Sequence, residues 1–322
     1  MAIEFSIIVP VYNRPQEIDE LLESLVNQSF QDSFEVIVVE DGSSVKADQI
    51  IAKYEQQLTL KYYDKENTGA GMSRNYGMER ASGNYFIILD SDVIVPPDYL
   101  TNVHQCLSNQ FTDAFGGPDA AHPNFTSMQK AINFSMTSFL TTGGIRGKRG
   151  GVGKFQLRSF NLGMSKDAFE ATKGFSKMKT GEDIDFTFRL WEHGFKTQLI
   201  PEAFVYHKRR TNIKQFFHQT FAFGKARPIL NKKYPGTGKL TFWFPSLFLI
   251  GIDLSIIAAF FGELHPLGIY FLYFILIFLS SAFYNGIRVG LLAILTTFTQ
   301  FLGYGWGFLE SYFELNFRKN SN

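Results

Sequence analysis

Residues 85–92 read YFIILDSD, an apolar run that leads directly into two carboxylates two positions apart. Five consecutive apolar residues are typical of a short buried β-strand, and side chains two positions apart on an extended chain point the same way. Asp90 and Asp92 therefore lie beyond the carboxyl end of a predicted strand, where carboxylate oxygens can bind a divalent cation. For an isolated pair, a solvated turn is the simpler interpretation, so the rest of the chain decides between the two.

Three more apolar runs, at residues 5–9, 34–39 and 59–63, are separated by stretches long enough to hold helices. Between the first two runs, apolar residues recur at the spacing of an amphipathic helix: Ile18, Leu21, Leu22, Leu25 and Val26. Alternation of strand and helix predicts an α/β fold, with a mostly parallel sheet covered by helices. Ligands of such folds bind beyond the carboxyl ends of the strands.

The predicted strand ends are polar. Residues 10–14 read PVYNR after the first run, and residues 40–43 read EDGS after the second. Residues 67–75 read NTGAGMSRN, a glycine-containing turn that opens a helix and offers free N–H groups to an anion. Each feature alone has a plain structural explanation, such as a turn glycine or a surface arginine. At matched ends of one sheet, together with residues 90–92, they predict a single binding crevice.

Five segments in this order resemble the motifs of family-2 glycosyltransferases: residues 7–13 (IIVPVYN), 38–43 (VVEDGS), 67–75, 90–92 and 181–183 (GED). The resemblance extends over about the first 210 residues, and five ordered motifs make it specific. It implies a GT-A fold and an inverting enzyme that moves a sugar from a nucleotide-diphosphate sugar to a lipid-linked or glycan acceptor. No nucleic-acid partner is expected.

The resemblance also implies a metal site. In such enzymes the leaving group is a nucleotide diphosphate, whose developing charge a divalent metal neutralises. Asp92 matches the metal-ligand position, and Asp90 matches a residue that contacts the ribose or orients the site. His207 follows another short apolar run, where a single histidine is more often structural; the resemblance makes it a second metal ligand. The mainly oxygen ligands imply Mg²⁺ or Mn²⁺.

The same resemblance assigns the nucleotide pocket. Asp41 matches the residue that accepts a hydrogen bond from the base, and Pro10 and Tyr12 match the loop that borders the base and ribose. Arg74 matches the helix that closes the pocket. Uracil is the favoured base, and guanine stays open.

Acceptor activation requires a base that removes the hydroxyl proton as the oxygen attacks the sugar. Glu182 and Asp183 precede an apolar helical pattern, where acidic residues also serve as helix caps. The resemblance makes Asp183 the catalytic base and Glu182 a residue that helps to place the acceptor.

Residues 240–309 carry only three charged side chains: Asp253, Glu263 and Arg288. About twenty apolar residues span a bilayer, so this stretch holds two or three membrane helices, with candidate spans at 240–261, 266–284 and 287–309. A buried helical bundle is the alternative, but soluble domains rarely join apolar windows of this length. The sequence therefore predicts an integral membrane protein.

Basic charge is concentrated in residues 201–239, which hold nine lysines and arginines and one acidic residue, Glu202. The positive-inside rule places this segment and the domain before it in the cytoplasm, with the chain passing several times through the inner or plasma membrane. Arg318 and Lys319 also favour the cytoplasm, which three full crossings would not allow. Two crossings plus an interfacial or re-entrant segment would, and both topologies stay open.

The predicted organisation has four parts. Residues 1–210 form a cytoplasmic GT-A catalytic domain, residues 211–239 a basic juxtamembrane segment that meets membrane lipids, residues 240–309 a transmembrane region and residues 310–322 a polar tail. Cys106 is the only cysteine, so no disulfide forms within the chain.

Two other functions compete with this one. The first is a sugar nucleotidyltransferase. Such enzymes resemble one another in a glycine-rich loop with a basic residue directly after the first strand, whereas this chain has PVYNR there, at residues 10–14. A non-catalytic membrane protein that binds nucleotide sugars would depend on its intramembrane charges. The processive members' Gln-x-x-Arg-Trp motif is not reproduced at residues 219–223, QTFAF, which favours single-sugar addition.

Overall fold

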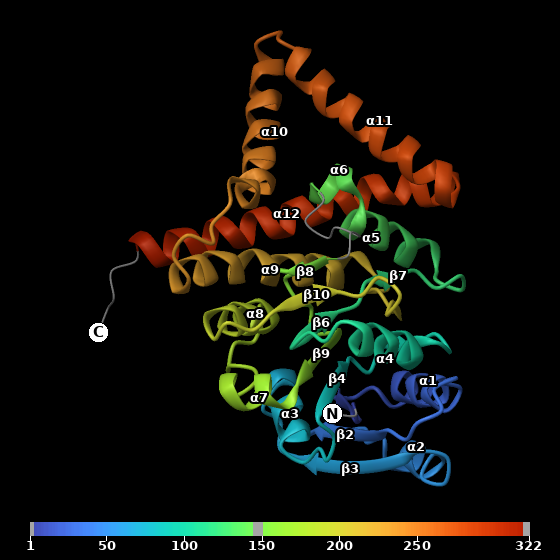
Figure 1. The fold of residues 1–322 in the computed structure, drawn as a ribbon. Coiled ribbons are helices and arrows are strands. Elements are labelled where there is room, and N and C mark those ends of the chain that lie inside the picture. The colour runs from blue at the N-terminus through green and yellow to red at the C-terminus, as the bar shows by residue number, and fades with distance from the viewer. Residues whose placement is uncertain (1–2, 144–150, 318–322) are drawn as a thin grey trace. The chain divides into compact units, whose positions relative to one another are not determined.

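The computed structural model describes residues 3–143 and 151–317 (Figure 1). The chain divides into two compact units that interleave along the sequence. The first comprises Met1–His122 and Lys148–His207, and the second comprises Pro123–Gly147 and Lys208–Asn322. Residues 123–147, which lie inside the predicted first domain, thus group with the C-terminal helices.

The first unit is built on a sheet with the strand order β3-β2-β1-β4-β9-β6-β10-β8. These strands are β1 (Phe5–Val11), β2 (Glu35–Asp41), β3 (Thr59–Lys65), β4 (Tyr85–Leu89), β6 (Ala114–Gly116), β8 (Gly151–Gly153), β9 (Asn161–Ser165) and β10 (Thr197–Leu199). The first four are mutually parallel, and β9 runs antiparallel to both β4 and β6. The predicted mostly parallel sheet is confirmed.

Helices cover both faces of this sheet because successive strand residues point to opposite sides. Ile7 and Val9 join one apolar core, whereas Ile8 joins the other. The helices of this unit are α1 (Pro15–Val26), α2 (Asp48–Ala52), α3 (Ala70–Met78), α4 (Tyr99–Asn109), α7 (Lys166–Thr172) and α8 (Glu182–Glu192). The predicted amphipathic helix corresponds to α1, whose Ile18, Leu21, Leu22 and Leu25 are buried.

A small second sheet has the order β5-β11-β7, with β5 (Val93–Ile94), β7 (Asp119–Ala120) and β11 (Val205–His207). The pairing of β5 with β11 is antiparallel and sets His207 opposite Val93. Two residues far apart in the sequence are thereby brought together directly after β4.

The second unit is helical. Its elements are α5 (Ser127–Thr137), α6 (Phe139–Thr142), α9 (Ile213–Lys233), the short 3₁₀ helix η1 (Leu240–Trp243), α10 (Phe244–Phe260), α11 (His265–Asn285) and α12 (Ile287–Phe317). Three stretches are long and apolar enough to cross a membrane by length and composition: Leu240–Phe260, His265–Asn285 and Ile287–Phe317. The last continues past the predicted limit of residue 309, because Phe308 and Ser311 remain buried against neighbouring helices.

Candidate active site

A pocket of about 210 Å³ lies at the carboxyl ends of β1 and β2. It is lined by Pro10, Val11, Tyr12, Asp41, Asn67, Gly69 and Ala70. Pro10 belongs to β1, and Tyr12 follows it with about half of its surface exposed (52%). Three of the four residues predicted for the nucleotide pocket, Pro10, Tyr12 and Asp41, therefore share one cavity.

Asp41 holds the wall of this pocket together. Its side chain accepts hydrogen bonds from the N–H groups of Thr68 and Gly69, each at 2.9 Å, and from the amine of Lys65. Burial alone would raise the pKa of Asp41, but these bonds lower it, so the group is ionised at neutral pH. The expectation of free N–H groups in this turn is therefore wrong for Thr68 and Gly69, because the Asp41 carboxylate already occupies them.

Asp90, Asp92 and His207 form a cluster beyond the end of β4. Each offers one ligand atom, and these atoms all lie within 4.8 Å of one another. The β5–β11 pairing places His207 beside Asp92, and the imidazole stacks on the ring of Phe160 with centroids 4.7 Å apart. The two predicted metal ligands, Asp92 and His207, and the predicted ribose residue, Asp90, thus come together from two distant segments.

The electrostatics of Asp92 suit a cation. Its Oδ1 lies 3.2 Å from Nε2 of His207, and its Oδ2 accepts from the guanidinium of Arg14. Burial would raise the pKa of Asp92, but attraction to His207 and Arg14 lowers it below its usual value. A carboxylate held charged in a buried setting is a strong ligand.

Unsatisfied atoms test whether the cluster fits a metal. Within residues 3–143 and 151–317, Oδ1 of Asp92 and Nδ1 of His207 are buried and make no hydrogen bond. Buried polar atoms normally have a hydrogen-bonding partner, so these two atoms indicate that a bound group, such as a metal ion, interacts with them. Two carboxylates and one imidazole are a donor set that fits a divalent cation.

Arg74 lies between the acidic cluster and α8 rather than in the lining of the 210 Å³ pocket. Its guanidinium donates to Oδ1 of Asp90 at 2.7 Å and to Oε1 of Glu182 at 3.1 Å. Only 3% of the Arg74 side chain is exposed. Because a buried guanidinium cannot lose its proton, this bridge fixes Asp90 and Glu182 relative to each other.

Glu182 and Asp183 occupy the first turn of α8, which begins after Gly181 in a left-handed conformation (φ 80°). Oδ1 of Asp183 accepts from the N–H of Ile184 at 2.8 Å. Burial and the charge of Asp183 raise the pKa of Glu182, against the opposing effect of Arg74. The two adjacent carboxyls thus have different partners: Glu182 bonds Arg74, and Asp183 bonds a backbone N–H of its own helix.

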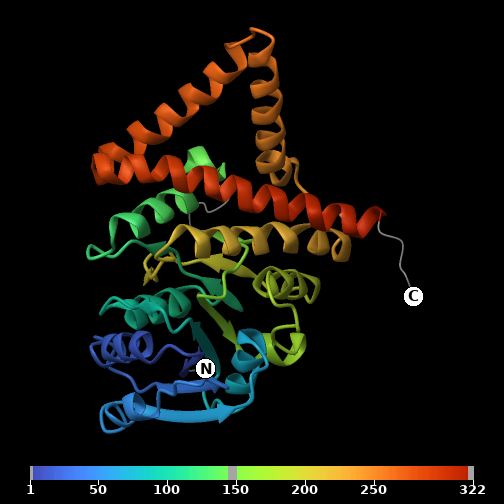
Figure 2. The same cartoon turned by 180° about the vertical axis from the view of Figure 1, so that it is seen from behind.

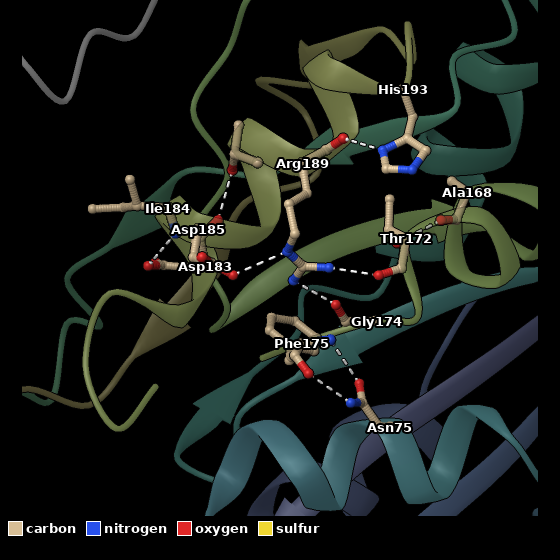
Figure 3. Close-up of polar contacts among 11 residues, drawn as sticks. Asn75, Ala168, Thr172, Gly174, Phe175, Asp183, Ile184, Asp185, Arg189 and His193 are labelled. Carbon is tan, nitrogen blue, oxygen red and sulfur yellow. Dashed lines mark hydrogen bonds and ion pairs between the residues drawn. The ribbon is translucent and has the colours of Figure 1, made fainter. Parts of the chain in front are cut away.

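A third acid of this turn has a structural role. Asp185 is fully buried and pairs with Nε of Arg189 at 3.0 Å (Figure 3). The two other nitrogens of Arg189 donate to the carbonyls of Thr172 and Gly174, each at 2.6 Å. This clamp holds the start of α8 against the end of α7.

Asn75, on α3, bonds the segment between α7 and α8. Its Nδ2 donates to the carbonyl of Phe175, and its Oδ1 accepts from the Phe175 N–H, both at 2.8 Å (Figure 3). Asn75 follows Arg74 on α3, so two consecutive residues link α3 to the start of α8 and to the segment before it.

Sequence reasoning missed three contributors: Arg14, Asn75 and Arg189. Arg14 ends the polar stretch after β1, and its position beyond the same sheet edge as Asp92 was a usable signal. Arg189 stands four residues after Asp185, the spacing of a helical ion pair. Asn75 lies in the motif at residues 67–75, but nothing in the sequence indicated its partner, which lies 100 residues away.

The arrangement defines a protein of the GT-A class, with a mostly parallel sheet whose strand ends carry a pocket and an acidic cluster. Residues 6–171 match the family described as "Glycosyl transferase family 2", more than half of the 322 residues. The chain belongs to this family, which confirms the resemblance noted in its motifs.

Relatives with described activities cover different parts of the chain. The poly(ribitol-phosphate) beta-N-acetylglucosaminyltransferase TarS of Staphylococcus aureus is 36% identical over 113 residues, 34% of this chain and 20% of TarS. A Methanococcus voltae enzyme is 24% identical over 266 residues, 78% of this chain and 80% of its own length. It is named dolichyl N-acetyl-alpha-D-glucosaminyl phosphate 3-beta-D-2,3-diacetamido-2,3-dideoxy-beta-D-glucuronosyltransferase. Like TarS, two other relatives are much longer than the matched region, which covers 25% of one and 12% of the other.

Solved structures show the same fold. The mannosyltransferase PcManGT from Pyrobaculum calidifontis, in complex with GDP-Man and Mn²⁺, superimposes with a TM-score of 0.67 at 16% identity, covering 95% of this chain and 88% of that one. S. aureus TarS 1–349 in complex with UDP-GlcNAc gives 0.51 at 19% identity, covering 96% and 91%. Both likenesses extend through the C-terminal helices.

Proposed function

We propose that the protein is a membrane-anchored inverting glycosyltransferase that moves a sugar from a nucleotide-diphosphate sugar to a hydroxyl of a lipid-linked or glycan acceptor. The family membership supports the class of reaction. The activities for which TarS and the M. voltae enzyme are named support glycan and lipid-linked acceptors. A UDP-sugar is the first candidate donor and a GDP-sugar the second, matching the ligands of the two structural neighbours.

The donor would bind across the strand ends. Pro10 and Tyr12 border the base and ribose, with Asp41 at the base and Asp90 at the ribose or orienting the site. Asp92 and His207 would hold a divalent metal, which neutralises the charge that develops on the diphosphate. A nitrogen ligand beside carboxylates favours Mn²⁺ over Mg²⁺, since Mg²⁺ binds almost only oxygen in proteins.

The chemical step requires the acceptor to be deprotonated as it reacts. Asp183 takes the hydroxyl proton while the acceptor oxygen forms a bond to C1 of the sugar. The bond from C1 to the phosphate oxygen breaks on the opposite face, and its electron pair leaves with the nucleotide diphosphate. Attack from the face opposite the leaving group inverts the configuration at C1.

Glu182 and Arg74 position the two substrates. Arg74 bonds Asp90 on the donor side and Glu182 on the acceptor side. Because Glu182 has a raised pKa beside Asp183, it is suited to hold an acceptor hydroxyl by hydrogen bonds. This bridge would keep donor and acceptor in a reactive geometry.

Addition of a single sugar, a cytoplasmic catalytic domain and the domain limits at residues 210, 239 and 309 belong to the same proposal. The sequence at residues 219–223 supports single addition, and the basic charge of residues 201–239 supports the cytoplasmic side.

One observation carries the proposal: the cluster of Asp90, Asp92 and His207 at the strand end, linked through Arg74 to the acids of α8. The test incubates the full chain in membranes with Mn²⁺, a panel of UDP- and GDP-sugars and lipid extract, and measures released nucleotide and labelled lipid product. Acceptor-dependent release from one donor supports the proposal. Binding of a donor without any release would identify a non-catalytic binding protein instead.

A further inference from the structure

The third apolar helix, α12, differs from the two before it. Its most apolar window is 44% buried inside the protein, against 22% for Leu240–Phe260 and 11% for His265–Asn285. Its 31 residues also make it about 46 Å long, well beyond the roughly 30 Å of a bilayer's hydrocarbon core. Length and burial both set α12 apart from an ordinary membrane crossing.

Helix α12 packs along two other helices of its unit, α5 and α9, as both views show (Figures 1 and 2). Near its start, Thr296 bonds the hydroxyl of Ser135 on α5 at 2.7 Å. Near its end, Glu310 pairs with Lys225 on α9 at 2.6 Å. The contacts therefore run along most of its length.

The packing against α9 is too close for larger side chains. A Cβ atom added to Gly303 would lie 2.2 Å from the hydroxyl of Thr220, and one added to Gly307 would lie 2.2 Å from the carbonyl of Phe221. Such backbone contact holds α9 and α12 together as a pair. Wherever α12 lies relative to a membrane, α9 must follow.

The charges of helix α9 make its insertion into a bilayer unfavourable in free energy. It carries five basic side chains: Lys214, Lys225, Arg227, Lys232 and Lys233. Each Lys or Arg at the centre of a membrane helix opposes insertion more strongly than an apolar residue favours it. A crossing by α12 would draw these charges and the polar atoms of α5 toward the hydrocarbon.

The two faces of α12 also differ in composition. The buried face carries the small and polar residues Thr296, Thr297, Gly303, Gly307 and Ser311, together with the apolar Val289, Phe301 and Phe308. The exposed face carries large apolar ones: Leu291, Leu295, Trp306, Phe313 and Phe317. An apolar outer stripe opposite a basic partner helix is the pattern of a helix that lies in the membrane interface.

Helices α10 and α11 also contact α12, but much less of their apolar windows is buried, 22% and 11%. Large apolar residues are exposed along both, including Leu254 at 60%, Phe260 at 86% and Phe271 at 70%. Between them, residues 261–264 contain Glu263, the charged side chain of a short turn. These features fit a hairpin that crosses the bilayer and returns.

We propose that the chain crosses the membrane twice, through α10 and α11, and that α12 lies along the bilayer surface. Its apolar face contacts the lipid of the leaflet on the side of the basic residues, and α9 faces away from that lipid. Lys239 and Arg288 then share one side, as the positive-inside rule demands. Arg318 and Lys319 lie outside the described residues, and their charge favours the same side. Glu263, in the turn of the hairpin, reaches the opposite side.

Cysteine labelling tests this topology without requiring activity, so its outcome is independent of the proposed transfer reaction. In a Cys106→Ser background, single cysteines replace Glu263, Asn285 or Asn316, and sealed vesicles of both orientations receive a membrane-impermeant maleimide. We expect Asn285→Cys and Asn316→Cys to react from the same side and Glu263→Cys from the other. Labelling of Asn316→Cys together with Glu263→Cys would overturn the proposal.

Depth measurement supplies a second, matched test. Nitroxides at Leu291, Leu302 and Phe313 report their immersion by paramagnetic relaxation with oxygen and a nickel chelate. A surface helix predicts the same shallow depth at all three sites, with Leu302 no deeper than the flanking two. A maximum at Leu302 or release of the protein from membranes by alkaline carbonate would contradict it.

Discussion

Two buried acids, one at each end of the large sheet, differ in how completely their carboxylate oxygens are hydrogen-bonded. At the amino end of β2, Glu35 is fully bonded: Oε1 accepts from the hydroxyl of Ser6 at 2.6 Å and the N–H of Ser82 at 2.5 Å, and Oε2 from Lys61 at 2.8 Å. Beyond the carboxyl end of β4, Oδ1 of Asp92 has only the nearby ring of His207. Both oxygens of the Glu35 carboxylate therefore have hydrogen-bond donors, whereas the Asp92 carboxylate can still bind a cation.

This difference separates stability from function. Although burial raises the pKa of Glu35, the bonds from Lys61, Ser6 and Ser82 lower it to about 2, so the ionised group stabilises the fold. Asp90 and Asp92 are also paired with cations, Arg74 and Arg14, but Oδ1 of Asp92 makes no hydrogen bond and can still bind a metal ion. Burial alone therefore does not identify a functional acid, whereas an unsatisfied oxygen in a cluster does.

The largest expected effect concerns Asp183, the proposed base. Asp183→Asn keeps the side chain's size and removes its basicity, so we expect the turnover number to fall by about 10³-fold, within the range for general bases. Donor affinity, measured by calorimetry with UDP and Mn²⁺, should change less than about twofold. Asp185→Asn serves as the contrasting variant, since loss of its pair with Arg189 should lower the melting temperature. Undiminished turnover in Asp183→Asn would remove Asp183 from the reaction.

The next effect separates the two acids after β4. Asp92→Asn should reduce metal-dependent turnover by about 100-fold or more, because it removes a proposed ligand. Asp90→Asn should cost less, since Arg74 and a ribose hydroxyl are its proposed partners. Turnover measured against Mn²⁺ concentration distinguishes them, and equal or reversed effects would contradict the assignment.

His207→Ala should weaken Mn²⁺ binding by about 10- to 100-fold while leaving UDP affinity in the absence of metal unchanged. Phe160→Leu is a matched control, because it removes the ring that stacks on His207 and keeps the imidazole. Unchanged Mn²⁺ affinity in His207→Ala would return this histidine to a structural role.

The smallest effect on turnover belongs to Glu35→Gln, which should leave it within about twofold yet destabilise the catalytic unit by on the order of 2 kcal/mol at neutral pH. The folded-state pKa of about 2 lies below the ordinary 4.5, so the stabilisation is present above pH 4.5 and is lost as pH falls toward about 2. Denaturant unfolding of wild type and variant across this range should show that the difference between their free energies of unfolding shrinks as the pH falls. A difference in free energy of unfolding that does not depend on pH would show that the bonds to the ionised Glu35 carboxylate are not its cause.

Much of this site is predictable from the sequence because its parts are local. The run of residues 85–89 predicts a strand by composition alone, and the spacing of residues 18–26 predicts α1. The acids then follow at fixed offsets, so the sequence alone makes Asp41, Asp90 and Asp92 candidates. By contrast, β9 reads NLGMS, an alternation of polar or small and apolar residues that is too short to identify a strand, and its antiparallel pairing with β4 has no signal in the sequence.

The remaining parts depend on contacts between distant segments. His207 reaches Asp92 through a pairing of a two-residue strand with a three-residue strand, which is too short to be predicted from sequence. Arg74 was expected at the nucleotide pocket, yet its guanidinium bridges two acids 92 positions apart, Asp90 and Glu182. Tertiary packing determines these partners, and local propensity does not encode them.

The comparison of the two acids is tested most directly by Mn²⁺ binding. Purified wild type, Asp92→Asn and Glu35→Gln are titrated with Mn²⁺ in the presence of UDP, and free Mn²⁺ is followed by electron paramagnetic resonance, with circular dichroism confirming that each is folded. We predict one tight site in wild type and in Glu35→Gln, and loss of that site in folded Asp92→Asn. Full Mn²⁺ binding by folded Asp92→Asn would contradict the account.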